Sequence, residues 1–83
     1  MRTNNLAAQV RDVVSEVLEL LPEELQGDAD LLTDLGADSI KILEVIVALE
    51  KRLDIHYPPP EVQTLRRVSE LVRLTEKYAS PVV

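Results

Sequence analysis

Aliphatic residues recur at helical spacing in the first part of the chain. Successive members are four, three, four and three positions apart, which places them on one face of a helix: Leu6, Val10, Val13, Val17 and Leu20. Asn4 or Asn5 can cap the start of this helix. Pro22 ends it, because a proline disfavours helical geometry in the residue before it. The spacing therefore predicts an amphipathic first helix that runs as far as Leu21.

Further helical segments follow, separated by prolines and polar residues. The long connection from Pro22 to Asp38 can hold a short turn of helix between Pro22 and Gln26. The second helix is expected from Ser39 to about Leu53 and is apolar on most of its circumference. A short helical turn is expected between Glu61 and Leu65, and a last helix between Val68 and Tyr78. The pattern predicts an all-α fold, a four-helix bundle of three main helices and one short one.

Composition supports one small helical domain over residues 1–83. The chain has no cysteine, so it has neither a disulfide nor a cysteine zinc site to stabilise it. Its only aromatic residues are Tyr57 and Tyr78, so the core is expected to consist of Leu, Val, Ile and Ala. Burying one such aliphatic side chain contributes roughly 1.5–3 kcal/mol. A compact helical bundle is the architecture in which that contribution most easily offsets the entropy of ordering the chain.

Charge narrows the range of partners. The net charge is −6 and the isoelectric point is near 4.6, which argues against binding nucleic acid or an anionic membrane surface. No uninterrupted apolar stretch approaches the length of a membrane span, and the first residues do not read as a signal peptide. We therefore expect a soluble, cytoplasmic protein without nucleic-acid or membrane partners, acting as a monomer.

One hydroxyl stands at a bend directly before the second helix. Gly36 can adopt a positive φ angle, Asp38 is a good helix N-cap, and Ser39 then takes the first helical position with its side chain in solvent. A nucleophilic serine needs a base within hydrogen-bond reach, and the only histidine, His56, stands apart beside prolines. No catalytic residue is therefore predicted. Ser39 is interpreted as a hydroxyl that another enzyme modifies; the alternative is an ordinary capping serine.

The carboxylates of the long connection invite comparison with a calcium loop. Asp28, Asp30 and Asp34 are spaced as ligands could be. An EF-hand loop, however, needs a glycine in the middle and a bidentate glutamate at the end. Gly36 comes too late and no glutamate closes the loop, so no metal site is predicted.

The string from Leu35 to Ile40, followed by the long apolar helix, resembles the attachment motif of the acyl carrier proteins. The resemblance extends over almost the whole chain. It includes the amphipathic first helix, Leu31 in the long loop, the proline after the second helix (Pro58), and residues of the second and last helices: Glu44, Ala48, Leu49, Glu50, Val68, Leu71 and Val72. It implies that a separate phosphopantetheinyl transferase attaches 4′-phosphopantetheine from coenzyme A to Ser39, with Asp38 as helix cap and transferase contact. The attached arm would carry acyl groups as thioesters, so the protein itself needs no catalytic residue.

The resemblance also implies two further sets of residues. Partner enzymes, namely acyl-loading, ketosynthase or acyltransferase-type enzymes, would dock on an exposed strip of the second helix: Ile40 and Val47, flanked by Lys41, Glu44 and Lys51. A short acyl chain would enter the interior between the second and last helices, in a pocket lined by Leu43, Ile46, Leu49, Val62 and Leu71. The competing expectation is that these aliphatic side chains already fill the interior.

Several positions depart from the carriers of primary fatty acid synthesis. Those carriers have a strongly acidic second helix, whereas Lys41 stands where they have an acid two positions after the serine. From Asp38 to Leu53 three acids balance three bases, and three consecutive prolines follow. These features favour a dedicated carrier in a specialised pathway such as polyketide synthesis. Two alternatives stay open: a peptidyl, aminoacyl or aryl carrier of nonribosomal peptide assembly, and a small helical adaptor without a prosthetic group.

Overall fold

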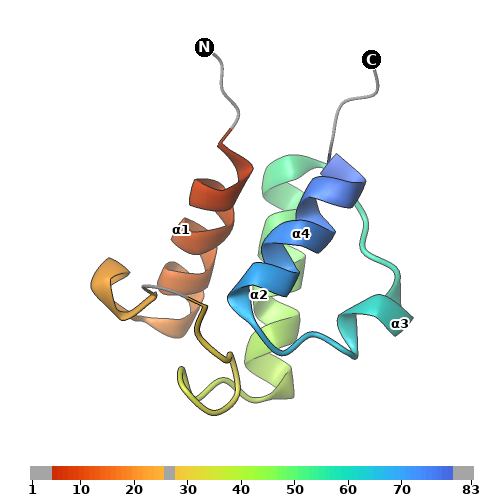
Figure 1. The fold of residues 1–83 in the computed structure, drawn as a ribbon. Coiled ribbons are helices and arrows are strands. Elements are labelled where there is room, and N and C mark those ends of the chain that lie inside the picture. Colours follow the sequence, from red (N-terminus) through yellow and green to blue (C-terminus); the bar gives the residue numbers. More distant parts are fainter. Residues whose placement is uncertain (1–4, 26–27, 80–83) are drawn as a thin grey trace.

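The computed structural model describes residues 5–25 and 28–79 and folds them into helices (Figure 1). In chain order these are α1 (Leu6–Leu18), the 3-10 helix η1 (Pro22–Leu25), α2 (Ser39–Leu53), α3 (Pro59–Val62) and α4 (Val68–Ala79). The described residues hold no strand, only an isolated antiparallel bridge between Asp30 and Arg67. The predicted all-α bundle of three main helices and one short one is confirmed.

Helix α1 starts as predicted and ends earlier. The Asn5 side chain caps it by accepting a hydrogen bond from the Ala8 amide at 3.2 Å; the other candidate cap, Asn4, lies outside the described residues. The helix stops at Leu18, so the predicted end at Leu21 is wrong. Glu19 turns into the left-handed region at φ 58° and ψ 50°, and the Leu20 amide donates back to the Ser15 carbonyl at 2.9 Å. This left-handed C-terminal turn ends the helix before Pro22 is reached.

The four later elements lie where the sequence pattern predicts them, with small shifts in the bounds of two. Helix α2 has the predicted bounds, and the 3-10 helix η1 is the short turn expected after Pro22. Helix α3 begins at Pro59 rather than at Glu61, because prolines fit the first turn of a helix, where their missing N–H needs no partner. Helix α4 begins at Val68 as expected and ends at Ala79, one residue later than predicted.

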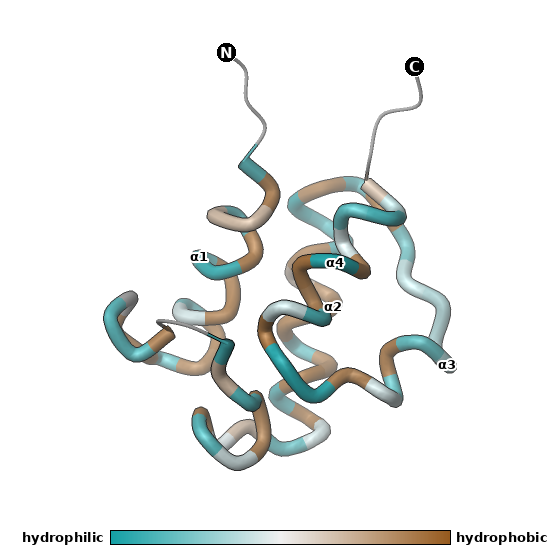
Figure 2. Tube along the Cα trace, viewed as in Figure 1, coloured by the Kyte–Doolittle hydropathy of each residue, from teal (hydrophilic) through white to brown (hydrophobic). Residues whose placement is uncertain are grey.

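The core lies where α1 packs against both α2 and α4. Figure 2 shows the hydrophobic residues of α1 on the side that faces those two helices. The main helices contribute buried aliphatic residues to it: Val10, Val13, Val14, Val45, Ile46, Leu49, Val68 and Leu71. The expectation of a purely aliphatic core is wrong, because Tyr57 is only 2% exposed and Thr75 offers its hydroxyl a partner in the interior.

Candidate functional site

The chain presents Ser39 at the point where the long loop becomes α2. Gly36 adopts the positive φ of 70° that its lack of a side chain permits. Asp38 is extended, and its carboxylate accepts the Lys41 amide at 2.9 Å. The predicted cap is therefore confirmed, and Ser39 is the first residue of the helix with its side chain exposed. The first amides of any helix lack an intrahelical acceptor, so this hydroxyl stands beside groups that favour a negative charge.

The three loop carboxylates fix the loop rather than converge on one point. Asp30 is buried and accepts the amides of Leu32 and Thr33 through one oxygen, both at 2.9 Å. Asp34 accepts the Asp30 amide at 2.9 Å, and Asp28 accepts the Ser69 amide of α4 at 3.0 Å. Within residues 5–25 and 28–79, no group of three acidic or histidine side chains is placed to hold a metal ion.

A charge partner also holds Asp30. Its second oxygen lies 3.3 Å from the Arg66 guanidinium, just before α4. The hydrogen bond from the Thr33 amide, followed by the Leu32 amide and the Arg66 charge, lowers the pKa of Asp30 below its ordinary value of 3.8. Sequence inspection considered Asp30 only as a metal ligand and missed this role. An aspartate followed by two residues with free amides is the local signal that could have revealed it.

One face of α2 is exposed and apolar. Ile40 is 65% exposed and Val47 is 46% exposed, as the predicted strip requires. Leu43 is 54% exposed and lies on the same face, so its predicted place in the interior is wrong. Residues 40, 43 and 47 are three and four apart, which aligns them along one side of a helix. They form an open groove of about 470 Å³ on the protein surface, lined by Ile40, Leu43, Glu44, Val47, Ala48 and Lys51.

The other predicted pocket residues do face inward. Leu49 and Leu71 are buried in the core, Ile46 is 5% exposed, and Val62 of α3 packs against the core from its edge. Ile46 and Leu71 also line a crevice with no space for a water molecule, whose other walls are Leu18, Leu31, Ala37, Ile42, Val45 and Leu65. Since the interior is filled in this conformation, a chain could enter only if these side chains separated. The role of the four inward residues toward an acyl chain stays a prediction.

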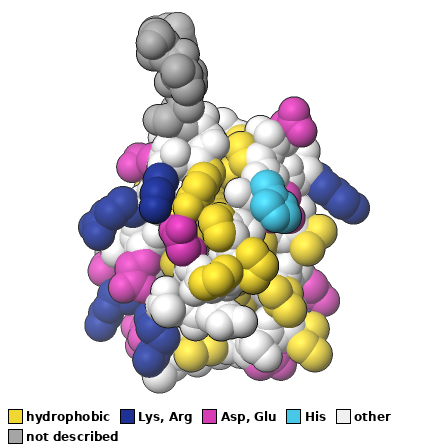
Figure 3. Space-filling model, turned by 90° about the vertical axis from the view of Figure 1, so that its right-hand side faces the viewer, with side chains coloured by type: hydrophobic (Ala, Val, Ile, Leu, Met, Phe, Trp, Pro, Cys, Tyr) yellow, Lys and Arg dark blue, Asp and Glu magenta, His cyan; other side chains and the backbone are white. Residues whose placement is uncertain are grey.

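Charge is distributed unevenly over the molecule. From Asp12 to Asp38 the chain has nine acidic residues and no basic one, whereas α2 carries both signs. On α2, Lys41 lies 3.6 Å from Glu44, and Lys51 lies one turn beyond Val47. From Arg66 to Lys77 the chain has four basic residues and two acidic ones. Figure 3 shows Lys and Arg side chains along one edge of the face in view, interspersed with acidic ones, beside a band of apolar side chains.

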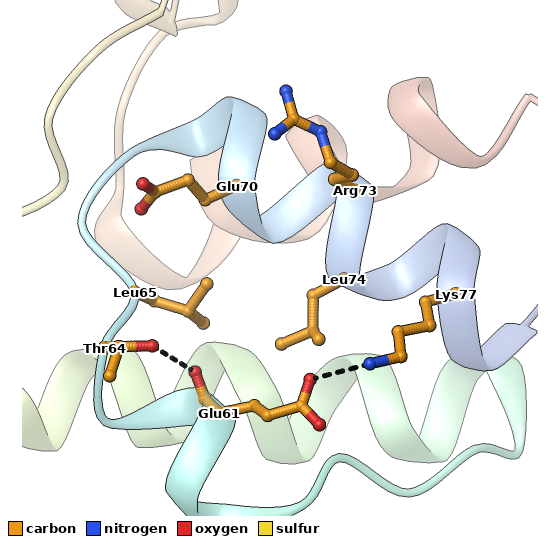
Figure 4. A pocket seen from close by; sticks show the side chains of 7 residues that line it. All are labelled: Glu61, Thr64, Leu65, Glu70, Arg73, Leu74 and Lys77. Carbon is orange, nitrogen blue, oxygen red and sulfur yellow. Dashed lines mark hydrogen bonds and ion pairs between the residues drawn. The ribbon is translucent and has the colours of Figure 1, made fainter.

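A second groove, of about 370 Å³, lies between α3 and α4 (Figure 4). Its polar rim is largely paired within the protein. Glu61 of α3 lies 3.4 Å from the Lys77 ammonium and also accepts the Tyr78 hydroxyl, which lowers the pKa of Glu61. Leu65 and Leu74 form its apolar floor. These contacts hold α3 against α4, and we assign the groove no chemistry.

Comparison with known proteins agrees with this geometry. The family model for the phosphopantetheine attachment site matches residues 8–75. The chain belongs to the acyl carrier protein family. It is similar to the acyl carrier protein of Campylobacter curvus (strain 525.92), with 37% identity over 68 residues, which are 82% of this chain and 88% of that relative. It is also similar to the acyl carrier protein of Akkermansia muciniphila, with 32% identity over 77 residues, 93% of this chain and 96% of the relative.

Membership of the acyl carrier protein family implies a covalently attached 4′-phosphopantetheine and the role of a carrier rather than a catalyst. It also implies interaction with a phosphopantetheinyl transferase and with synthesis enzymes. The start of α2 fits such a group. Ser39 is exposed, and the Asp38 carboxylate accepts a hydrogen bond from the Lys41 amide of the first turn. The Lys41 side chain places a cation in the same turn. No helix in the described part of the chain is long and apolar enough to cross a membrane.

Proposed function

We propose that Ser39 is the residue to which 4′-phosphopantetheine is attached, and that this acyl carrier serves a specialised pathway such as polyketide synthesis. The observation that carries the attachment site is the exposed Ser39 hydroxyl at the first position of α2, directly after the Asp38 cap. A phosphodiester at this position would lie beside the free amides of the first turn. When attached, the group supplies the thiol that holds acyl intermediates as thioesters.

The balance of three acids and three bases from Asp38 to Leu53 supports the specialised pathway. Partners of an acidic recognition helix would carry basic residues, and those residues would meet Lys41 and Lys51 here. We therefore propose that loading, ketosynthase or acyltransferase-type partners of this carrier place an apolar side chain in the groove of Ile40, Leu43 and Val47, and carboxylates opposite the two lysines. Rim charges of this kind mainly set the rate of encounter and exclude wrong partners, while a small apolar centre contributes much of the affinity.

The interior offers the second part of the proposal. A short acyl chain would enter between α2 and α4, along Ile46 and Leu71 and beneath Val62 of α3, in the direction of Leu49. Support comes from the crevice at the start of α2, which is wholly apolar and lined by side chains that can adjust their rotamers. The curated relatives described above are acyl carriers, which favours acyl over aminoacyl or aryl cargo. The cofactor implied by the family argues against an adaptor without a prosthetic group.

Intact mass spectrometry tests the attachment site. The protein is coexpressed with a promiscuous phosphopantetheinyl transferase, and it should gain the mass of one arm. Ser39→Ala should gain none while keeping its helical circular dichroism, because an exposed first-turn hydroxyl contributes little packing. Ser69→Ala is the matched control: Ser69 also lies in the first turn of a helix, and this variant should gain the arm in full. Loading of Ser39→Ala would show that the site is elsewhere.

A further inference from the structure

Two hydroxyl groups, those of Tyr57 and Thr75, form a hydrogen bond in the interior of the bundle, and its donor can be assigned. The Tyr57 hydroxyl oxygen lies 2.6 Å from Thr75 Oγ1, and Thr75 Oγ1 lies 2.7 Å from the Leu71 carbonyl oxygen. Thr75 has a single hydroxyl hydrogen, which it donates to Leu71, so Tyr57 must donate to Thr75. Tyr57 is 2% exposed and Thr75 is fully buried, so water does not compete for these bonds.

The backbone of Tyr57 is fixed as well. Its amide donates to the Glu50 carboxylate of α2 at 2.9 Å, and the next residue is Pro58, whose ring restricts the chain. Tyr57 is therefore bound to α2 through its amide and to α4 through its hydroxyl. Its ring is among the largest side chains that are fully buried.

This ring lies beyond the apolar crevice as seen from Ser39. Ile46 and Leu71 line the crevice, which begins at Ala37 and Ile42 near the start of α2. Leu49 and Thr75 follow Ile46 and Leu71 by about one helical turn, farther from Ser39, and Tyr57 contacts this deeper layer through Thr75. A chain that entered from the Ser39 end would reach the Tyr57 layer last.

We propose that Tyr57 acts as a plug that sets the length of acyl chain the interior can hold, so that this carrier shelters short acyl chains and leaves the ends of long ones in solvent. The inference rests on the proposed entry of an acyl chain between α2 and α4. Leu and Val side chains make way by changing rotamer. Tyr57 can make way only by breaking its bond to Thr75, which leaves a buried hydroxyl oxygen without its donor.

A series of acyl lengths tests the plug. The arm on Ser39 is loaded with acetyl, butanoyl, octanoyl or dodecanoyl groups as stable amide analogues, and amide chemical shifts are compared. In the wild type, butanoyl should shift Ile46 and Leu71, whereas dodecanoyl should shift them no further than octanoyl and leave Leu49 and Thr75 unmoved. Movement of Leu49 and Thr75 by dodecanoyl in the wild type would overturn the proposal, whether or not any variant folds.

Variants distinguish the effect of the Tyr57–Thr75 hydrogen bond from a general loosening of the core packing. Tyr57→Phe keeps the ring and removes the bond, and Thr75→Val removes the acceptor; in both, dodecanoyl should now shift Leu49. Tyr78→Phe is the matched control, because it removes a tyrosine hydroxyl that binds Glu61 at the surface, and it should behave as the wild type. A length profile unchanged by Tyr57→Phe and Thr75→Val overturns the plug alone.

The mass of each sample separates this inference from the proposed function. Protein that carries the loaded arm but shows no interior shift at any length overturns both the pocket and the plug while leaving Ser39 as the attachment site. Protein that takes up no arm overturns the proposed function itself, and the plug with it.

Discussion

The carboxylate of Asp30 lies 3.3 Å from the guanidinium of Arg66, although 36 positions separate them in the sequence. The same carboxylate accepts the amides of Leu32 and Thr33. A backbone hydrogen bond joins the same two segments, because the Leu31 amide donates to the Arg66 carbonyl at 2.7 Å. The loop that presents Ser39 is thus bound to the segment that begins α4.

Substituting Asp30 should lower the thermal stability in a graded way. Asp30→Asn keeps an acceptor for the two loop amides and loses the charge opposite Arg66, whereas Asp30→Ala loses both. We expect the midpoint of thermal unfolding, followed by circular dichroism, to fall in the order wild type, Asn, Ala. An Ala variant as stable as the wild type would show that the loop is held by its apolar contacts alone.

The dependence of stability on pH should show the contribution of the Asp30 charge separately from that of its hydrogen bonds. Its pKa is lowered in the folded state, so its contribution to stability is present above the ordinary value of 3.8 and is lost as the pH falls through the lowered pKa. The unfolding midpoint of the wild type should therefore drop more steeply than that of Asp30→Asn as the pH falls below about 4. Asp28 and Glu61, whose pKa values are also lowered, contribute equally in both proteins. Parallel curves would contradict this prediction.

Asp38 should have two separable effects. As the cap of α2, its replacement by Ala should cost about 1 kcal/mol in the free energy of unfolding, while Asn should cost little because it caps as well. Denaturant titration measures this difference. If the carboxylate also contacts the transferase, the rate of arm attachment should fall for Asp38→Asn as well as for Asp38→Ala. A normal rate for the Asn variant would limit Asp38 to its capping role.

Truncating two leucines of α2 should affect different properties: stability for Leu49 and reaction with partner enzymes for Leu43. Leu49 is fully buried, so Leu49→Ala should destabilise the protein by roughly 2–5 kcal/mol. Leu43 is exposed, so Leu43→Ala should change the stability by no more than about 0.5 kcal/mol. Turnover of the loaded carrier by its partner enzymes should nevertheless fall for Leu43→Ala. Unchanged turnover would remove Leu43 from the proposed docking groove.

Reversing the charge of α2 should redirect partner choice. The double variant Lys41→Glu with Lys51→Glu should slow reaction with the cognate enzymes and improve recognition by enzymes of fatty acid synthesis, which expect an acidic helix. Rates are compared at low ionic strength, where such effects are largest. Arg52→Glu is a control outside the groove and should have a smaller effect. Equal rates for wild type and double variant with both enzyme sets would contradict the proposed role of these lysines.

The local elements were largely predictable from the sequence. Helix α2 was predictable from Asp38 as its cap and from uninterrupted apolar periodicity. The positive φ of Gly36 was predictable because glycine adopts that conformation without steric cost. These features depend on residues within one or two turns of each other. The early end of α1 was not predicted, because Glu19 adopts a left-handed conformation that non-glycine residues seldom take.

What faces inward was decided by the tertiary structure. Helix α2 is apolar on most of its circumference, so its sequence alone assigned Leu43 and Leu49 to the same interior, and only the packing of α1 and α4 against one side separates them. The burial of Tyr57 and Asp30 was not predicted either, because the core was expected to be aliphatic and Asp30 was considered only as a metal ligand. Their burial depends on Thr75 and Arg66, which are distant in sequence and supply hydrogen bonds that only the folded chain brings within reach.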